Sequence, residues 1–246
     1  GDVYKRQGLT RQEIQKTNDG RLEQIKSITD SSLQNMEERA YQLINSQMVR
    51  NLASAKSYRV EKQEEWAQNV MQDLKLLLGK ESVISNAFLL FRNIDVVLDT
   101  SSKFDREIFY QMFFSDYYSS KDACVNDLFI SQLKEYKVIT NHAGAQKILF
   151  LYTYPVMDTS KTAVAVFELD LARLMEKIDL SDSALLLVDD KERVWLQSGM
   201  EIPVDSVKSA DTGSRMVRYG GKGYVENAVH SDKALSLIHI SAPTRP

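Results

Sequence analysis

The sequence predicts an α+β fold in which long N-terminal helices precede two antiparallel sheet units, the second of them incomplete. The first 80 residues show a helical repeat of apolar residues and very few turn residues. After Gly79 the apolar residues gather in short strand-like runs, and short turns join them, which indicates antiparallel pairing. We therefore expect a helical stalk at 8–80, a first α/β unit at 81–180 and a partial second unit at 181–234.

The stalk is expected to contain a long helix followed by a second one. Gly20 is the only glycine between Gly8 and Gly79, and this stretch contains no proline. Its apolar residues recur at steps of three and four: Leu22, Ile25, Ile28, Leu33, Met36, Ala40, Leu43 and Ile44. A break is predicted at 51–58, where Ala and Ser replace the apolar stripe. The second helix is predicted at 61–78, with Gly79 as its stop.

Both sheet units begin with a predicted hairpin. In the first unit, 84–92 pairs with 95–99, and two further strands lie at 147–156 and 161–170; helices are expected at 104–118, 127–136 and 171–178. In the second unit the predicted hairpins join 184–190 to 193–198 and 215–219 to 223–229.

Both ends of the chain differ in character from the body. VYKRQ near the start and LSLIHISAPTRP at the end resemble translated sequencing-adaptor read-through. We assign residues 1–7 and 235–246 to this source and leave them out of the functional interpretation. The alternative is a native terminal strand, because Leu235, Leu237, Ile238 and Ile240 suit a strand. Under our assignment the body is an internal fragment, and signal, membrane-spanning or output segments are expected beyond it.

Composition excludes several classes of function. The net charge is −3, so the chain offers no overall basic character for nucleic acid, and we predict that this region binds none. No run of 18 apolar residues occurs. Cys124 is the only cysteine, which excludes an internal disulfide and a thiolate zinc cluster. We expect Cys124 to be a small buried apolar residue.

No motif predicts catalysis, a cofactor or a metal. The GGKG run at 220–223 lacks the spacing of a phosphate-binding loop and is expected to be a turn. Asp189 and Asp190 suit a hairpin turn better than a pair of catalytic carboxylates. His142 and His230 lack metal-ligand spacing. We therefore predict a protein that is not an enzyme, and keep a cytosolic enzyme with an unfamiliar motif as the least favoured alternative.

Aromatic residues indicate a possible ligand pocket. Phe and Tyr crowd residues 109–118, two tyrosines alternate along the strand at 147–156, and an aspartate ends the strand at 161–170. An aromatic wall with one carboxylate suits a cationic or amine-bearing ligand. The predicted ligand-binding residues are Tyr110, Tyr117, Tyr152, Tyr154 and Asp170. The alternative is that the aromatic residues belong to the core and that Asp170 caps the following helix.

The order of these elements resembles that of double Cache sensors, the PAS-like extracellular domains of bacterial membrane receptors. The resemblance covers most of 8–234 and includes the stretches NMEERAYQLINSQMVRNL, SNAFLLFRNIDVVLD, LFLYTYPV, AVAVFELDLARLM and ALLLVDDKERVWLQSG. These are most similar to the sensor regions of Gram-positive AraC-type transcriptional regulators, followed by Cache-type histidine kinases. The resemblance implies that 81–180 is a membrane-distal PAS-like unit and 181–234 part of a membrane-proximal one.

On this resemblance the chain senses an unidentified small molecule outside a Gram-positive cell and passes a shift through the long helix to an AraC-type output. The helix is also expected to mediate a homodimer. Amino-acid-binding Cache domains carry a Tyr…Arg-x-Trp-Tyr…Tyr…Asp pattern, but DYYSSKD (116–122) lacks the Arg-x-Trp and only Asp170 falls at a matching place. The resemblance therefore does not extend to amino-acid recognition, and carbohydrates, peptides, other small molecules or a partner sensor protein are open as ligands. The alternatives are the sensor of a histidine kinase or chemoreceptor, and a structural dimerisation module that binds no ligand.

Overall fold

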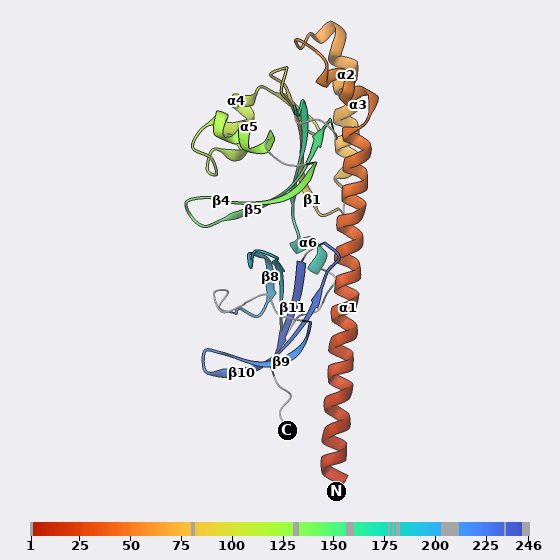
Figure 1. Cartoon of the computed structure of the whole chain (residues 1–246), viewed down its shortest axis with the longest axis vertical. Helices are drawn as coiled ribbons and strands as arrows, with labels where there is room; N and C mark the ends of the chain where they lie inside the picture. Colours follow the sequence, from red (N-terminus) through yellow and green to blue (C-terminus); the bar gives the residue numbers. More distant parts are fainter. Residues whose placement is uncertain are drawn as a thin grey trace. The chain divides into compact units, whose positions relative to one another are not determined.

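The fold, seen in a computed structural model, is α+β with two antiparallel sheets, as predicted (Figure 1). The structure describes residues 2–79, 82–129, 133–155, 160–176, 178, 180, 183–202, 212–233 and 235–242. The chain divides into two compact units. One is Gln34–Asp170, and the other combines Gly1–Leu33 with Leu171–Pro246. The division after Asp170 falls earlier than the boundary at 180 expected from the sequence.

The N-terminal helices follow the predicted apolar stripe. Helix α1 (Asp2–Ile44) contributes to both units, and all the stripe residues are buried except Ile28, which is 39% exposed. Helix α1 ends at Ile44 because Ser46 caps a new helix, α2 (Gln47–Ala53); its Oγ accepts a hydrogen bond from the Val49 amide at 3.4 Å. This interruption precedes the one predicted at 51–58. The loop after α2, at 54–59, overlaps the later part of the predicted break, whereas 51–53 are still helical; α3 (Val60–Leu77) follows the loop.

The unit Gln34–Asp170 is built on a six-stranded sheet with the order β3-β2-β1-β6-β5-β4. Its strands are β1 (Ile84–Phe91), β2 (Val97–Leu98), β3 (Lys103–Phe104), β4 (Lys134–Thr140), β5 (Gln146–Tyr154) and β6 (Ala163–Leu169). Helices α1 and α3 lie on one face. The other face is covered by α4 (Arg106–Phe109), the π-helix η1 (Tyr110–Phe114) and α5 (Lys121–Phe129) (Figure 1).

The helix predicted at 127–136 is wrong. Helix α5 ends at Phe129, and Lys134 begins β4, the edge strand that pairs with β5. Residues 134–140 pair with β5 along their whole length, and this tertiary pairing outweighs the local helix propensity of the segment. The helix predicted at 104–118 is shorter, spanning α4 and η1. Helix α6 (Ala172–Met175) is shorter than the predicted 171–178, and its N-cap is Leu171 instead of Asp170.

The second unit contains a five-stranded sheet with the order β8-β7-β11-β10-β9. The strands are β7 (Ser183–Asp189), β8 (Val194–Gly199), β9 (Gly213–Tyr219), β10 (Lys222–His230) and β11 (Leu235–Ser241). Both predicted hairpins form. The Asp189 carboxylate closes the β7–β8 turn by accepting hydrogen bonds from the Lys191 and Arg193 amides at 3.0 and 2.8 Å. Gly220 and Gly221, at φ of 55° and 79°, form the β9–β10 turn.

Strand β11 lies between β7 and β10 and consists of residues that the sequence assigns to adaptor read-through. Leu237, Ile238 and Ile240 are fully buried, which is the arrangement expected for a terminal strand, the alternative named for this segment. One residue fits poorly. His239 lies opposite Asn227, both are buried, and none of their side-chain nitrogen and oxygen atoms has a hydrogen-bond partner among the residues that the structure describes.

Candidate functional site

The helix-covered face of the six-stranded sheet is apolar over most of its area. Leucine and valine side chains of β5 and β6 pack there together with Phe88 of β1. The rings of Phe109 and Phe114, from α4 and η1, lie above them. The Phe88–Phe109 and Phe109–Phe114 ring centroids are each 5.1 Å apart, a spacing typical of favourable aromatic pairs.

Two charged side chains interrupt this apolar face. Because side chains alternate along a strand, Glu168 shares a face with Val166, and Lys147 shares one with Leu149. The Lys147 Nζ lies 3.1 Å from both carboxylate oxygens of Glu168, and the Asn86 amide donates to the same carboxylate at 3.1 Å. The side chains of Lys147 and Glu168 are 18% and 16% exposed. The ion pair is therefore largely shielded from water.

Two aromatic rings lie beside the Lys147 ammonium group. The Lys147 Nζ lies 5.6 Å from the centre of the Phe114 ring and 5.3 Å from that of Tyr117, within range of a cation–π attraction. Burial raises the pKa of the Tyr117 hydroxyl, as do the nearby Glu168 and Asp116 carboxylates. Tyr117 therefore presents a neutral hydroxyl and a ring face beside a buried charge pair.

A second polar network connects the covering helices to the edge strand. Lys137 of β4 lies 2.9 Å from Oδ1 of Asp127 in α5 and also donates to the Asp127 carbonyl at 3.0 Å. The Tyr118 hydroxyl donates to Oδ2 of Asp127 at 2.6 Å, and Tyr110 donates to the Tyr118 carbonyl at 2.8 Å. Burial and the hydrogen bond to Asp127 raise the pKa of Tyr118.

The five residues predicted to bind a ligand do not line one cavity. Tyr110 and Tyr117 lie with the helix-covered face. Tyr152 lies on the opposite face, where its ring centre is 6.1 Å from that of Tyr41 in α1, and strand alternation places Tyr154 on that face too. Asp170 follows β6, and its amide donates to the Val83 carbonyl at 2.7 Å. A binding role for these residues stays a prediction.

Lys147, Glu168 and Asn86 are not among the residues predicted from the sequence. A signal was present, because Glu168 follows AVAVF and Lys147 precedes ILFLY at positions where strand alternation directs a side chain into the core. Charged residues are rarely buried unless they are paired or functional. The sequence pattern does not show that β5 and β6 are neighbours in the sheet, in the register that brings Lys147 and Glu168 together.

Reactive chemistry finds little support in the described residues. Cys124 is fully buried, as predicted, and burial raises the pKa of its thiol to about 12, which disfavours the nucleophilic thiolate. Among the described residues no group of His, Cys, Asp and Glu is arranged to hold a metal ion. The Lys147–Glu168 pair instead offers one ammonium and one carboxylate group for noncovalent contacts.

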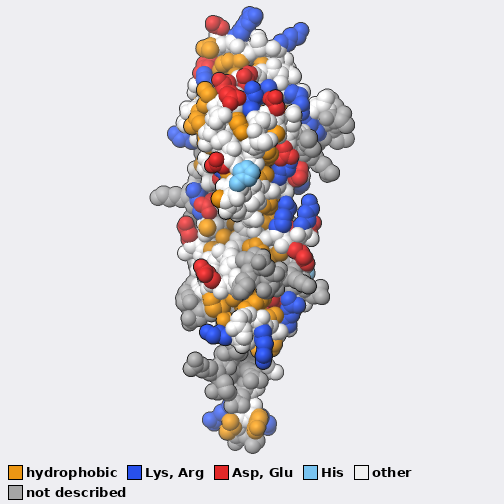
Figure 2. All heavy atoms as spheres, turned by 90° about the vertical axis from the view of Figure 1, so that its left-hand side faces the viewer, with side chains coloured by type: hydrophobic (Ala, Val, Ile, Leu, Met, Phe, Trp, Pro, Cys, Tyr) orange, Lys and Arg blue, Asp and Glu red, His pale blue; other side chains and the backbone are white. Residues whose placement is uncertain are grey.

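On the face shown in Figure 2, Lys and Arg side chains are interspersed with Asp and Glu. This face offers no continuous basic surface of the kind that binds a phosphate backbone. Within the described residues, no helix combines the length and apolar character needed to cross a bilayer.

No protein-family model and no curated protein sequence matches the chain. Solved structures do match. The sensor domain of the Vibrio cholerae histidine kinase DctB aligns with a TM-score of 0.59 at 11% identity, covering 95% of this chain and 99% of that one. The sensory domain of the Campylobacter jejuni chemoreceptor Tlp3, with isoleucine bound, gives 0.55 at 12% identity and 94% coverage of both chains. The fold is therefore that of Cache-type sensor domains.

A third match is the ligand-binding domain of the Pseudomonas aeruginosa amino-acid chemoreceptor PctC in complex with GABA. It gives a TM-score of 0.52 at 13% identity and covers 95% of this chain and all of that one. At such low identity these matches establish the fold but neither the ligand nor the output domain.

Proposed function

We propose that the chain is the ligand-sensing extracytoplasmic region of a bacterial transmembrane signalling protein, and that its six-stranded unit binds a small molecule on the helix-covered face. The observation that carries this proposal is the Lys147–Glu168 pair. A shielded ion pair contributes little net stability compared with apolar side chains of similar size. Its presence beneath aromatic rings is better explained by recognition of a polar ligand.

The ligand that suits this site carries charge on a small apolar body. An ammonium group can replace Lys147 beside the Glu168 carboxylate, and an anionic group can pair with the Lys147 ammonium. Two of the similar structures contain isoleucine and GABA, which have both kinds of group. Because DYYSSKD lacks the Arg-x-Trp pattern, recognition here would rest on Lys147, Glu168 and the ring of Tyr117 instead.

The route from this site to the long helix passes through β4. Lys137 projects to the helix-covered face and holds Asp127 of α5. On the opposite face, Tyr136 donates to the buried Glu37 carboxylate of α1 at 2.8 Å, and Lys134 lies 3.5 Å from it. A ligand that moves α5 would thereby move β4 and change the contacts of Tyr136 and Lys134 with Glu37 of α1. Hydrogen exchange along α1 should respond to ligand in the native chain and respond less in Tyr136→Phe.

The output that we propose is an AraC-type DNA-binding domain in a Gram-positive cell, joined through flanking membrane helices, and the resemblance of the quoted stretches supports it. A histidine kinase or chemoreceptor output is the second candidate, favoured by the solved sensor domains that match the fold. We also propose that α1 mediates a homodimer, as expected for a signalling helix. A structural module without a ligand is the competing function.

A thermal-shift screen tests ligand binding. The probes are the common amino acids, GABA, short dicarboxylates, monosaccharides and dipeptides, each at several millimolar. At one hundred times its Kd, a ligand adds about 2.7 kcal/mol of stability, which raises Tm by about 5–11 °C for a chain of this length. Glu168→Gln or Lys147→Met should abolish the shift, whereas the exposed α3 changes Glu61→Gln and Lys62→Met should leave it intact. A panel without any shift, in a folded chain, favours the structural module.

A further inference from the structure

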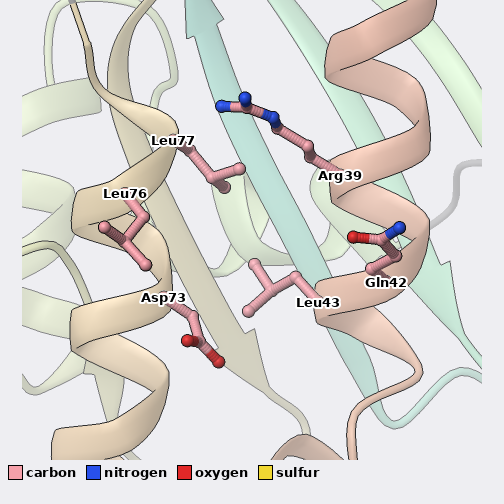
Figure 3. A pocket seen from close by; sticks show the side chains of 6 residues that line it. All are labelled: Arg39, Gln42, Leu43, Asp73, Leu76 and Leu77. Carbon is pink, nitrogen blue, oxygen red and sulfur yellow. The ribbon is translucent and has the colours of Figure 1, made fainter.

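A groove of about 480 Å³ lies between α1 and α3, within the unit Gln34–Asp170 (Figure 3). Leu43 of α1 and Leu77 of α3 point toward each other and form its apolar floor, where they are 5% and 6% exposed. Leu76 stands at the rim and is 72% exposed. An exposed leucine beside an apolar floor is typical of a surface that another helix covers.

Charges of opposite sign lie at the two ends of this groove. Arg39 projects from α1 beside Leu77, and Asp73 projects from α3 beside Leu43 (Figure 3). Across the part of the chain that the structure describes, neither side chain has an ion-pair or hydrogen-bond partner. Burial raises the pKa of the Asp73 carboxyl, as expected where a nearby cation does not compensate for lost water.

The surface is self-complementary. In a two-fold dimer every contact occurs twice, so Arg39 of one copy can meet the partner's Asp73 while its own Asp73 meets the partner's Arg39. Asp73 and Leu77 are one helical turn apart, so the two charges are offset along the groove by about 6 Å, which a long arginine side chain can span. The exposed Leu76 of each copy would enter the apolar groove of the other.

We propose that a second copy of this chain docks on the α1–α3 groove, with reciprocal Arg39–Asp73 ion pairs around Leu76. This inference rests on the proposed function, because it assigns the face through which the signalling helix dimerises. It places the dimer contact in the unit that carries the ligand site. It also involves α3, which the sequence alone does not connect with dimerisation.

Charge reversal tests the pairing. Arg39→Glu and Asp73→Lys should each weaken dimerisation about tenfold or more, because each brings like charges together twice. The double variant Arg39→Glu/Asp73→Lys exchanges the charges and should restore dimerisation to near the native level. Sedimentation equilibrium measures the change from the monomer mass of 28.1 kDa to twice that value. The exposed controls Arg50→Glu and Glu65→Lys make the same charge changes elsewhere and should leave the dimer unaffected.

A crosslink provides a second measurement. Cys124 is buried, so Leu76→Cys introduces the only accessible thiol, and a flexible bis-maleimide crosslinker should convert the chain to a covalent dimer. Met112→Cys, at a residue 60% exposed on η1, should crosslink far less. A native chain that stays monomeric up to millimolar concentration, or a double variant without rescue, overturns the proposal. Ligand thermal shifts measured on the monomeric variants test the sensing function separately, so each hypothesis can fail alone.

Discussion

Replacing Lys147 by methionine is expected to destabilise the unit Gln34–Asp170 by about 2–3 kcal/mol. Removing one partner of a fully buried ion pair typically costs about 3–5 kcal/mol, since the remaining charge is left without its counter-ion. Here the Glu168 side chain is 16% exposed and keeps the Asn86 amide as a donor, so the cost is lower. Methionine also retains contact with the Phe114 and Tyr117 rings, which limits the loss of packing.

The double variant Lys147→Met/Glu168→Leu separates structure from function. Both new side chains are apolar and lie beside Leu149 and Val166, on a face that is already apolar. Replacing a shielded ion pair by well-packed apolar residues is often neutral or stabilising. We therefore expect the double variant to be within about 1 kcal/mol of the native chain, or more stable, and to have lost every ligand-induced thermal shift.

Urea denaturation followed by tryptophan fluorescence provides the assay. Trp66 lies in the unit Gln34–Asp170 and Trp195 in the other, so a Trp195→Phe background restricts the signal to the unit under test. The free energy of unfolding comes from linear extrapolation. If Lys147→Met costs less than about 0.5 kcal/mol, the pair is not shielded as the structure indicates. If the two single changes simply add, Lys147 and Glu168 are not coupled, and the argument for a recognition site fails.

Two further predictions concern pH. Burial, with a smaller effect of Arg21, lowers the pKa of His239, so the unfolded chain binds a proton at a higher pH than the folded chain does. The free energy of unfolding of the five-stranded unit should therefore decline below about pH 6.5. His239→Leu should remove this decline and add about 1–3 kcal/mol of stability, because it removes a buried side chain without a hydrogen-bond partner among the described residues. Unchanged urea midpoints between pH 7.5 and 5 would contradict this. Hydrogen bonds from Gln68 and then Lys103 lower the pKa of Glu64 to about 2, so its contribution is present above about pH 4.5 and lost toward pH 2. Because Glu64 is one-third exposed, Glu64→Gln should cost about 1 kcal/mol or less at pH 7 and nothing near pH 2, and equal costs at both pH values would refute the assignment.

Part of the candidate site was accessible from the sequence. Aromatic crowding at 109–118 correctly located the residues that cover the sheet, and Tyr117 does lie beside the charge pair. The prediction that Tyr152 lies with these aromatic residues is not supported. Alternation along a strand shows which residues share a face of the sheet, but it does not show which segments cover that face. The neighbouring segments decide this, and Tyr152 lies against Tyr41 of α1.

The sequence by itself determined the elements whose signal is local: the apolar stripe of α1 and α3, the first hairpin, and the turns at Asp189 and Gly220. Each depends on residues within a few positions of one another, so propensity and periodicity are sufficient. Only the tertiary structure decided that 134–140 is an edge strand, that Lys147 meets Glu168, and that Arg39 and Asp73 share one groove. These facts depend on which distant segments become neighbours, and that choice is made by burial summed over the whole unit.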